Sequence, residues 1–177
     1  MKKISDNLLE PSQQQLNSLL KYYQTGQYVD AEKLSLSITQ EFPEHRFAWK
    51  VLAAVLKQKG KINESLIVSQ KSVQLDPQDA GAHYNLGATL QELRRLEEAE
   101  ASYRQSITLK PEFAEVHHNL GVILQEQGRL KEAEASYRQS ITLNPNLAQA
   151  HLNLGNVMIK QGRLKEAEAS YRQSITL

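Results

Sequence analysis

The chain has 177 residues, and its 21 basic and 20 acidic side chains give a formal net charge of +1. A chain this close to neutral is a poor general binder of DNA, RNA or acidic membranes, and the absence of cysteine excludes disulfides, thiolate zinc sites and a cysteine nucleophile. Its 40% hydrophobic and 23% charged residues are ordinary globular values, which argues against global disorder.

The first eleven residues form an N-terminal extension that lacks the apolar stretch of a signal peptide. No apolar run in the chain approaches the ~20 residues that span a bilayer, so we expect a cytoplasmic protein without membrane contact. Pro11 suits the first turn of a following helix. Leu8 and Leu9 have two interpretations: they pack as a lid over the first repeat, or they belong to a frayed terminus.

Residues 12–177 repeat with a period of 34 residues, which is the first feature to settle before domains are counted. Prolines recur at one phase of the period, at Pro43, Pro77, Pro111 and Pro145. Glycines recur at another, at Gly26, Gly60, Gly128 and Gly162, with Arg94 in the middle place. The segment from Arg129 to Leu143 returns unchanged from Arg163 to Leu177. We divide the array into repeats 12–45, 46–79, 80–113, 114–147 and 148–177, the last of them incomplete.

Each repeat is predicted to form two helices, which in the third repeat span residues 80–93 and 96–109. An apolar stripe of helical period marks the second helix, at Leu96, Ala99, Tyr103 and Ile107. Pro111 cannot continue that helix, and no segment alternates with the period of two that a half-buried strand needs. A 34-residue hairpin buries its apolar stripe only by stacking on its neighbours, so the sequence predicts an all-α solenoid with a concave face built from the first helices.

The repeats resemble the tetratricopeptide repeat family. Its pattern of Leu-Gly, Ala, an aromatic residue and Pro is matched in the third and fourth repeats by Leu86-Gly87, Ala99, Tyr103 and Pro111, and by Leu120-Gly121, Ala133, Tyr137 and Pro145. The fifth repeat stops before its proline, the second has Ser65 and Ser69 where Ala and an aromatic are usual, and the first matches least well. The resemblance implies a right-handed α-solenoid of helix-turn-helix hairpins that binds other proteins, often as extended peptides along the concave face.

Two series of recurring glycines predict features of the helices. Gly87, Gly121 and Gly155 lie in the middle of first helices, where glycine costs ~1 kcal/mol relative to alanine, so we expect another helix to cross there. The series that includes Gly128 ends first helices with a left-handed residue, and Arg94 at the equivalent place predicts a different turn in the third repeat.

One branch of the family, the superhelix of O-linked N-acetylglucosamine transferase and related bacterial proteins, is especially similar. It carries an Asn before the Leu-Gly pair of successive repeats, and the matching residues are Asn85, Asn119, Asn153 and, in the first repeat, Asn17. An amide offers one acceptor and two donors, so a row of amides binds a peptide backbone rather than a sequence. The competing interpretation is inheritance from near-identical repeats with no present ligand.

Other residues are expected on the same face. They are Gln91, Glu92, Gln125, Glu126, His118, Asn156, Ile159 and Lys160. They predict a polar, mildly acidic groove that turns neutral or basic at one end and suits a partner segment with some basic character. The branch that clamps the carboxylate of chaperone tails is disfavoured, because Tyr84, His118 and Leu152 precede the asparagines and only Lys50 is basic there.

Catalytic and cofactor sites are not predicted. The in-register His83, His117 and His151 occupy the packing place of Trp49, and successive hairpins hold them too far apart to share one metal ion. Tyr103, Tyr137 and Tyr171 are expected in the core rather than as a platform for RNA bases. The chain lacks phosphate-loop, dinucleotide and zinc-protease motifs, so we expect no enzyme and no cofactor.

The sequence therefore predicts a non-catalytic protein-binding module. Two alternatives remain open because the last helix carries no polar cap. One is a scaffold that stacks end to end with another copy through its bare ends, which would form a homo-oligomer. The other is a fragment that serves as the substrate-recognition arm of a larger transferase.

Overall fold

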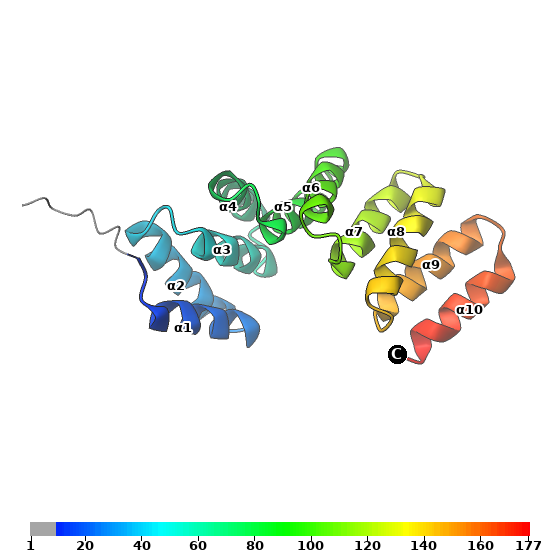
Figure 1. The fold of residues 1–177 in the computed structure, drawn as a ribbon, viewed down its shortest axis with the longest axis horizontal. Coiled ribbons are helices and arrows are strands. Elements are labelled where there is room, and N and C mark those ends of the chain that lie inside the picture. The colour runs from blue at the N-terminus through cyan, green and yellow to red at the C-terminus, as the bar shows by residue number, and fades with distance from the viewer. Residues whose placement is uncertain (1–9) are drawn as a thin grey trace, which may run out of the picture. The chain divides into compact units, whose positions relative to one another are not determined.

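The computed structural model describes residues 10–177, which form ten α-helices and no strand. The expectation for Leu8 and Leu9 lies outside the described residues. The helices are α1 (Gln13–Gln24), α2 (Tyr28–Glu41), α3 (Arg46–Gln58), α4 (Ile62–Leu75), α5 (Ala80–Glu92), α6 (Leu96–Leu109), α7 (Ala114–Glu126), α8 (Leu130–Leu143), α9 (Ala148–Lys160) and α10 (Leu164–Ile175). Each odd-numbered helix packs against the helix that comes after it, so the all-α solenoid of helical hairpins is confirmed (Figure 1).

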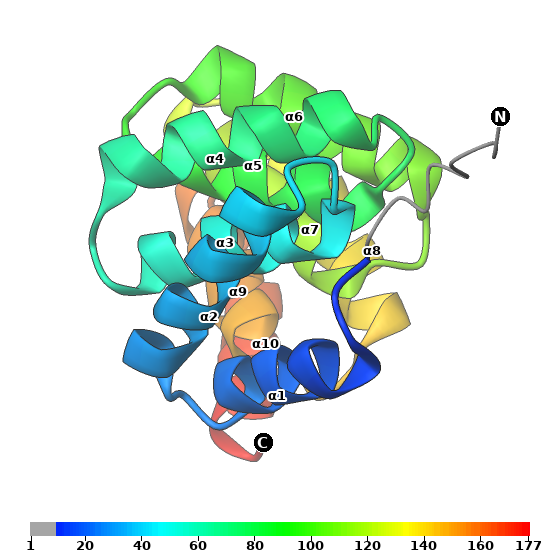
Figure 2. The same cartoon turned by 90° about the vertical axis from the view of Figure 1, so that its left-hand side faces the viewer.

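The chain divides into two compact units, residues 1–77 and 78–177. Unit 1 contains α1 to α4, which are drawn in blue to blue-green in Figure 2. Within it α1 also contacts α3, and Leu19, Ile38 and Val55 are fully buried between the helices. Its core is thus shared by both hairpins, as stacking predicts.

Unit 2 contains three hairpins, α5–α6, α7–α8 and α9–α10. The second helix of each hairpin packs on the first helix of the next, α6 on α7 and α8 on α9, and the first helices α5, α7 and α9 contact one another in succession. Ala99, Ala133 and Ala167, one repeat apart in the second helices, are fully buried, because small side chains let the paired helices approach closely.

The turn inside each hairpin has one geometry throughout. In the α7–α8 hairpin Gly128 has a φ of +77°, its N–H donates to Gln125 O, and Arg129 N donates to Leu124 O at 2.8 Å. Arg94 has a φ of +59°, and its turn has the same bonds, from Arg94 N to Gln91 O and from Arg95 N to Leu90 O. The expectation of a different turn in the third repeat is therefore wrong: the backbone bonds that close the turn hold Arg94 in the left-handed conformation.

The left-handed conformation of Arg94 is strained and should therefore lower the free energy of unfolding. The left-handed conformation costs a residue with a Cβ about 1–2 kcal/mol, and its exposed ion pair with Glu126, at 2.6 Å, is worth about 0–1 kcal/mol. We expect Arg94→Gly to be more stable than Arg94→Ala by ~1 kcal/mol, because both variants lose the ion pair and only glycine relieves the strain. Urea unfolding of the two variants measures this difference, and equal midpoints would contradict it.

The mid-helix glycines lie where another helix packs closely, as expected. A Cβ on Gly87 would lie 2.7 Å from the ring of Tyr103, and one on Gly121 would lie 2.6 Å from the ring of Tyr137. These tyrosines belong to α6 and α8, so the helix that leaves no room for a Cβ is the second helix of the same hairpin, through its aromatic side chain. Tyr103 and Tyr137 are buried as predicted, whereas Tyr171 in the last hairpin is only partly buried.

Candidate functional site

The predicted site residues of unit 2 lie on its first helices. Asn85 on α5, Asn119 on α7 and Asn153 on α9 occupy the same place in three successive helices that contact one another, and all three side chains are partly exposed. Asn17 belongs to unit 1, where it is exposed and accepts a hydrogen bond from Gln13 at 2.9 Å.

In the first two hairpins of unit 2, the tyrosine of the second helix hydrogen-bonds a glutamine of the first helix. The hydroxyl of Tyr103 donates to Gln91 Oε1 at 2.8 Å, and that of Tyr137 donates to Gln125 Oε1 at 3.1 Å. Burial raises the pKa of the Tyr103 hydroxyl, and a hydrogen bond from the Asn119 side chain on the next hairpin acts in the opposite direction. Gln91 and Gln125 thus hold the hydroxyls from one side, and the asparagine of the following repeat approaches from the other.

The same relation recurs one repeat later. Burial raises the pKa of Tyr137, the Glu126 charge adds to the rise, and a hydrogen bond from Asn153 opposes it. The row of asparagines is therefore part of the contact between successive hairpins as well as of the exposed face.

His118 joins two of the asparagines. Its Nδ1 lies 3.0 Å from Asn119 Oδ1, and its Nε2 lies 3.1 Å from Asn153 Nδ2. An amide oxygen accepts and an amide nitrogen donates, so the geometry requires a neutral ring with its proton on Nδ1. Burial lowers the pKa of His118, which favours this neutral form, although the Asn119 contact acts against the shift. The ring also packs on Tyr137, with centroids 5.7 Å apart.

The fifth repeat departs from this pattern. Ile159 stands where the earlier repeats have Gln91 and Gln125, so the hydroxyl of Tyr171 donates to Asn156 Oδ1 at 2.7 Å instead. Asn153 also accepts from Gln149 at 3.0 Å. Lys160 is exposed at the end of α9.

The acidic residues lie at the C-terminal ends of the first helices. Glu92 and Glu126 are exposed, but Glu126 is paired with Arg94. That pair offsets part of the acidity predicted for the middle of the face, so Glu92 contributes more of the remaining negative potential.

Two of the in-register histidines contact backbone carbonyl groups. His117 Nε2 lies 2.8 Å from the Pro111 carbonyl oxygen and His151 Nε2 lies 2.9 Å from that of Pro145. Trp49 Nε1 donates to the Pro43 carbonyl at 2.8 Å, which is the same contact six residues back along the chain. Within residues 10–177 no three His, Asp or Glu side chains are grouped as metal ligands.

Sequence reasoning placed the asparagines but missed their side-chain partners. The spacings that carry the network are visible in the sequence: twelve residues separate Gln91 from Tyr103, and sixteen separate Tyr103 from Asn119. Both spacings recur one repeat later, and the first fails where Ile159 replaces the glutamine. The recurrence of these Gln-to-Tyr and Tyr-to-Asn spacings from one repeat to the next was therefore a signal in the sequence for contacts between repeats.

The comparisons with known proteins agree with this architecture. The tetratricopeptide repeat model matches residues 78–145 and 112–177, more than half of the chain, and a second TPR repeat model matches residues 54–94. None of the curated protein sequences matches the chain. None of the helices in the described part of the chain has the length and hydropathy to cross a bilayer.

Solved structures share the fold at low identity. MamA (41-end) from Desulfovibrio magneticus RS-1 is 17% identical, with a TM-score of 0.80 over 92% of each chain. The pilF protein of Pseudomonas aeruginosa is 23% identical, with a TM-score of 0.83 over 92% of this chain and 74% of that one. A thermophilic TPR protein of Thermus thermophilus is 24% identical, with a TM-score of 0.77 over 93% of this chain and 90% of that one.

The comparisons do not specifically support the transferase superhelix, so that resemblance and the transferase-arm alternative stay predictions. Repeats of this kind generally serve as non-catalytic scaffolds, which supports a module for protein–protein interaction. On the match of its repeats, this chain belongs to the tetratricopeptide repeat family.

Proposed function

We propose that the face formed by α5, α7 and α9 binds an extended segment of a partner protein through the amides of Asn85, Asn119 and Asn153. The observation that carries the proposal is the recurrence of a partly exposed amide at one position of three successive, contacting helices. Each amide oxygen can accept from a backbone N–H. The Asn153 amide nitrogen already donates to His118 and Tyr137, so Asn153 contacts a partner backbone through its oxygen.

The contacts within the site orient these amides before any partner arrives. His118 touches Asn119 through one ring nitrogen and Asn153 through the other, and Gln149 donates to Asn153 as well. An amide oxygen has a second lone pair, so such contacts leave acceptor capacity while they restrict rotation. A side chain already held in place loses less entropy on binding, which raises affinity.

The charge of the face favours a partner segment with a basic residue near Glu92 and an acidic or neutral residue near Lys160. Each net hydrogen bond contributes about 0.5–1.5 kcal/mol, so three amides alone support weak binding and side-chain contacts are needed for more. Leu152 and Ile159 are exposed on α9 and offer apolar contact at that end.

The proposal is tested by replacing the three asparagines with alanine and measuring capture of an array of extended peptides of varied sequence. We expect the peptides held by the native protein to bind at least ~10-fold more weakly, a change of ~1.4 kcal/mol. The stability of the variant will also fall, because Asn119 and Asn153 contact neighbouring residues, so binding is measured where circular dichroism shows both proteins folded.

A matched control comes from the second helices. Gln105, Gln139 and Gln173 are exposed amides with the same one-repeat spacing on α6, α8 and α10, and their replacement by alanine should leave capture unchanged. The proposal fails if the native protein holds no peptide on the array, or if the asparagine and glutamine variants behave alike.

A further inference from the structure

A chain of hydrogen bonds with one direction runs through the site from α9 to α6. Asn153 Nδ2 lies 3.1 Å from His118 Nε2, and His118 Nδ1 lies 3.0 Å from Asn119 Oδ1. The Asn119 side chain in turn hydrogen-bonds the hydroxyl of Tyr103 on α6. With its proton on Nδ1 the ring accepts from Asn153 and donates to Asn119, so it connects two amides of neighbouring repeats in a fixed order.

The other contacts of Asn153 leave its oxygen as the atom that a partner meets. Its nitrogen also donates to the hydroxyl of the buried Tyr137, so both amide hydrogens are used within the protein. Its oxygen accepts from Gln149 Nε2 at 3.0 Å and keeps a second lone pair. Because the side chain is partly exposed, that lone pair is available to a backbone N–H of a bound segment.

Protonation of His118 would reverse this arrangement. An imidazolium has an N–H on both ring nitrogens, so His118 Nε2 would face the Asn153 nitrogen as a second donor. Rotation of the amide about its last side-chain torsion, which has two broad minima, relieves the conflict by bringing the oxygen to the ring. The amide nitrogen then points to the exposed side, where it can donate to a carbonyl but cannot accept from an N–H.

We propose that His118 is a positioning residue that sets which atom of Asn153 faces a partner segment and thereby makes capture of that segment dependent on pH. The inference rests on the proposed function, because it concerns the regulation of the same site. A neutral ring presents an acceptor to a backbone N–H of the partner, whereas a protonated ring presents a donor that this N–H cannot use. Binding therefore favours the neutral ring, and affinity falls as the pH falls through the titration of His118.

The immediate surroundings of His118 keep the ring neutral at neutral pH. Burial lowers the pKa of His118, and the contact with Asn119 acts in the opposite direction. The ring packs on Tyr137 of α8, with centroids 5.7 Å apart. Burial raises the pKa of Tyr137, so this neighbour stays uncharged over the range in which a histidine titrates.

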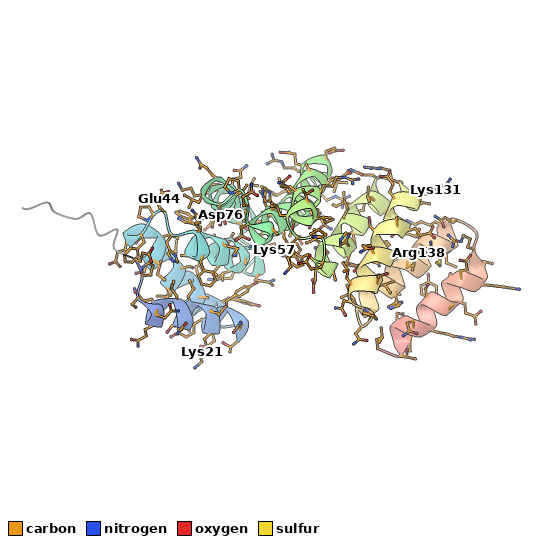
Figure 3. The ribbon with its side chains drawn as sticks, viewed as in Figure 1. Lys21, Glu44, Lys57, Asp76, Lys131 and Arg138 are labelled. Atoms are coloured by element: carbon orange, nitrogen blue, oxygen red, sulfur yellow. The ribbon has the colours of Figure 1, made fainter. Side chains whose placement is uncertain are left out.

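Charged groups on the neighbouring helices define what the test must hold constant. The basic side chains of α8 labelled in Figure 3, Lys131 and Arg138, are exposed, and Arg138 is paired with Glu134 at 2.8 Å. The other titratable or charged side chains on this side of α7 and of the helices packed on it are Tyr84 and Glu92 of α5, Tyr103 of α6, Glu115 and Glu126 of α7, and Lys160 of α9. Substitutions at His118 leave all of them in place.

The first test needs no partner. The whole protein is titrated from about pH 8 to about pH 5 while NMR follows the ring signals of His118 and the side-chain NH₂ signals of Asn153. We expect both sets of signals to change with one midpoint, which lies below the ordinary pKa of histidine. Asn153 signals that stay in place, or that follow the midpoint of another histidine, would overturn the inference.

Substitutions at His118 then separate positioning from packing, in titrations with an array peptide that lacks His, Asp and Glu. The native protein should bind ~10-fold more weakly at about pH 5 than at about pH 8, the effect of losing about one hydrogen bond. A glutamine has an acceptor and a donor but cannot be protonated, so His118→Gln should keep the tight binding at both pH values. His118→Leu has neither group and should bind weakly at both. Binding is measured where circular dichroism shows each protein folded.

His117→Trp is the matched control for the adjacent titrating ring on α7. Trp49 makes the same backbone contact in the second repeat, so this substitution keeps the contact with the Pro111 carbonyl while it removes the imidazole. The variant should keep the full pH dependence. The inference is overturned if His118→Gln retains the pH dependence, if His117→Trp abolishes it, or if the native protein binds equally at both pH values. A native protein that binds no peptide at either pH overturns the proposed function as well.

Discussion

Replacing Tyr137 by alanine is expected to lower the free energy of unfolding of unit 2 by about 3–5 kcal/mol, the cost of removing a large buried aromatic side chain. The ring is 1% exposed, fills the space above Gly121 and packs on His118, and its hydroxyl donates to Gln125. Its loss leaves a cavity and an unpaired amide in the middle of the unit. Urea unfolding followed by circular dichroism measures the change.

Tyr171→Ala provides the matched control, because the fifteen residues from 163 to 177 repeat those from 129 to 143. Tyr171 is only partly buried, so its replacement should cost about half as much. Equal losses at the two sites would show that burial between repeats does not decide the stability of these tyrosines.

Replacing Gly121 by alanine is the second large effect. The new Cβ would lie 2.6 and 2.7 Å from two ring carbons of Tyr137, and the buried ring has little room to move. Overpacking of this kind costs about 1–3 kcal/mol, and the better helix propensity of alanine returns about 1 kcal/mol. We expect a net loss of up to about 2 kcal/mol in the same unfolding measurement.

A double-mutant cycle assigns that loss to the ring. In a Tyr137→Leu background the flat ring is gone, so adding Gly121→Ala should cost nothing or stabilise the helix. If the alanine lowers stability equally in both backgrounds, the glycine is required for another reason and the packing explanation is wrong.

The sequence predicted most of the fold because the information is local and repeated five times. The third repeat was expected at residues 80–93 and 96–109, and α5 and α6 span Ala80–Glu92 and Leu96–Leu109. Proline ends and apolar stripes depend on neighbours a few residues away, so a single sequence suffices.

Contacts between helices were harder to predict. The Arg94 turn was misjudged because residue type alone does not show that the surrounding hydrogen bonds outweigh a strained φ. The sequence predicted a helix packed on Gly87, but periodicity did not show that the ring of Tyr103 is the part of α6 that lies on the glycine.

The sequence predicted which helices carry the asparagines of the candidate site, but not the side chains that contact them. Asn119 and Asn153 lie on the expected helices, but the contact of Asn153 with His118 joins residues 35 positions apart, about one repeat. Such contacts follow from how hairpins stack, which a helical period does not specify. The same stacking explains why identical segments on α8 and α10 differ in exposure.

The most direct test of the proposed function follows the side-chain NH₂ signals of the protein by NMR while a peptide selected from the array is added. Binding along the face of α5, α7 and α9 predicts that the signals of Asn85, Asn119 and Asn153 shift together and saturate at one dissociation constant, while those of Gln105, Gln139 and Gln173 stay in place. Signals that shift on the glutamines, or asparagine signals that do not move while the peptide binds, would contradict it.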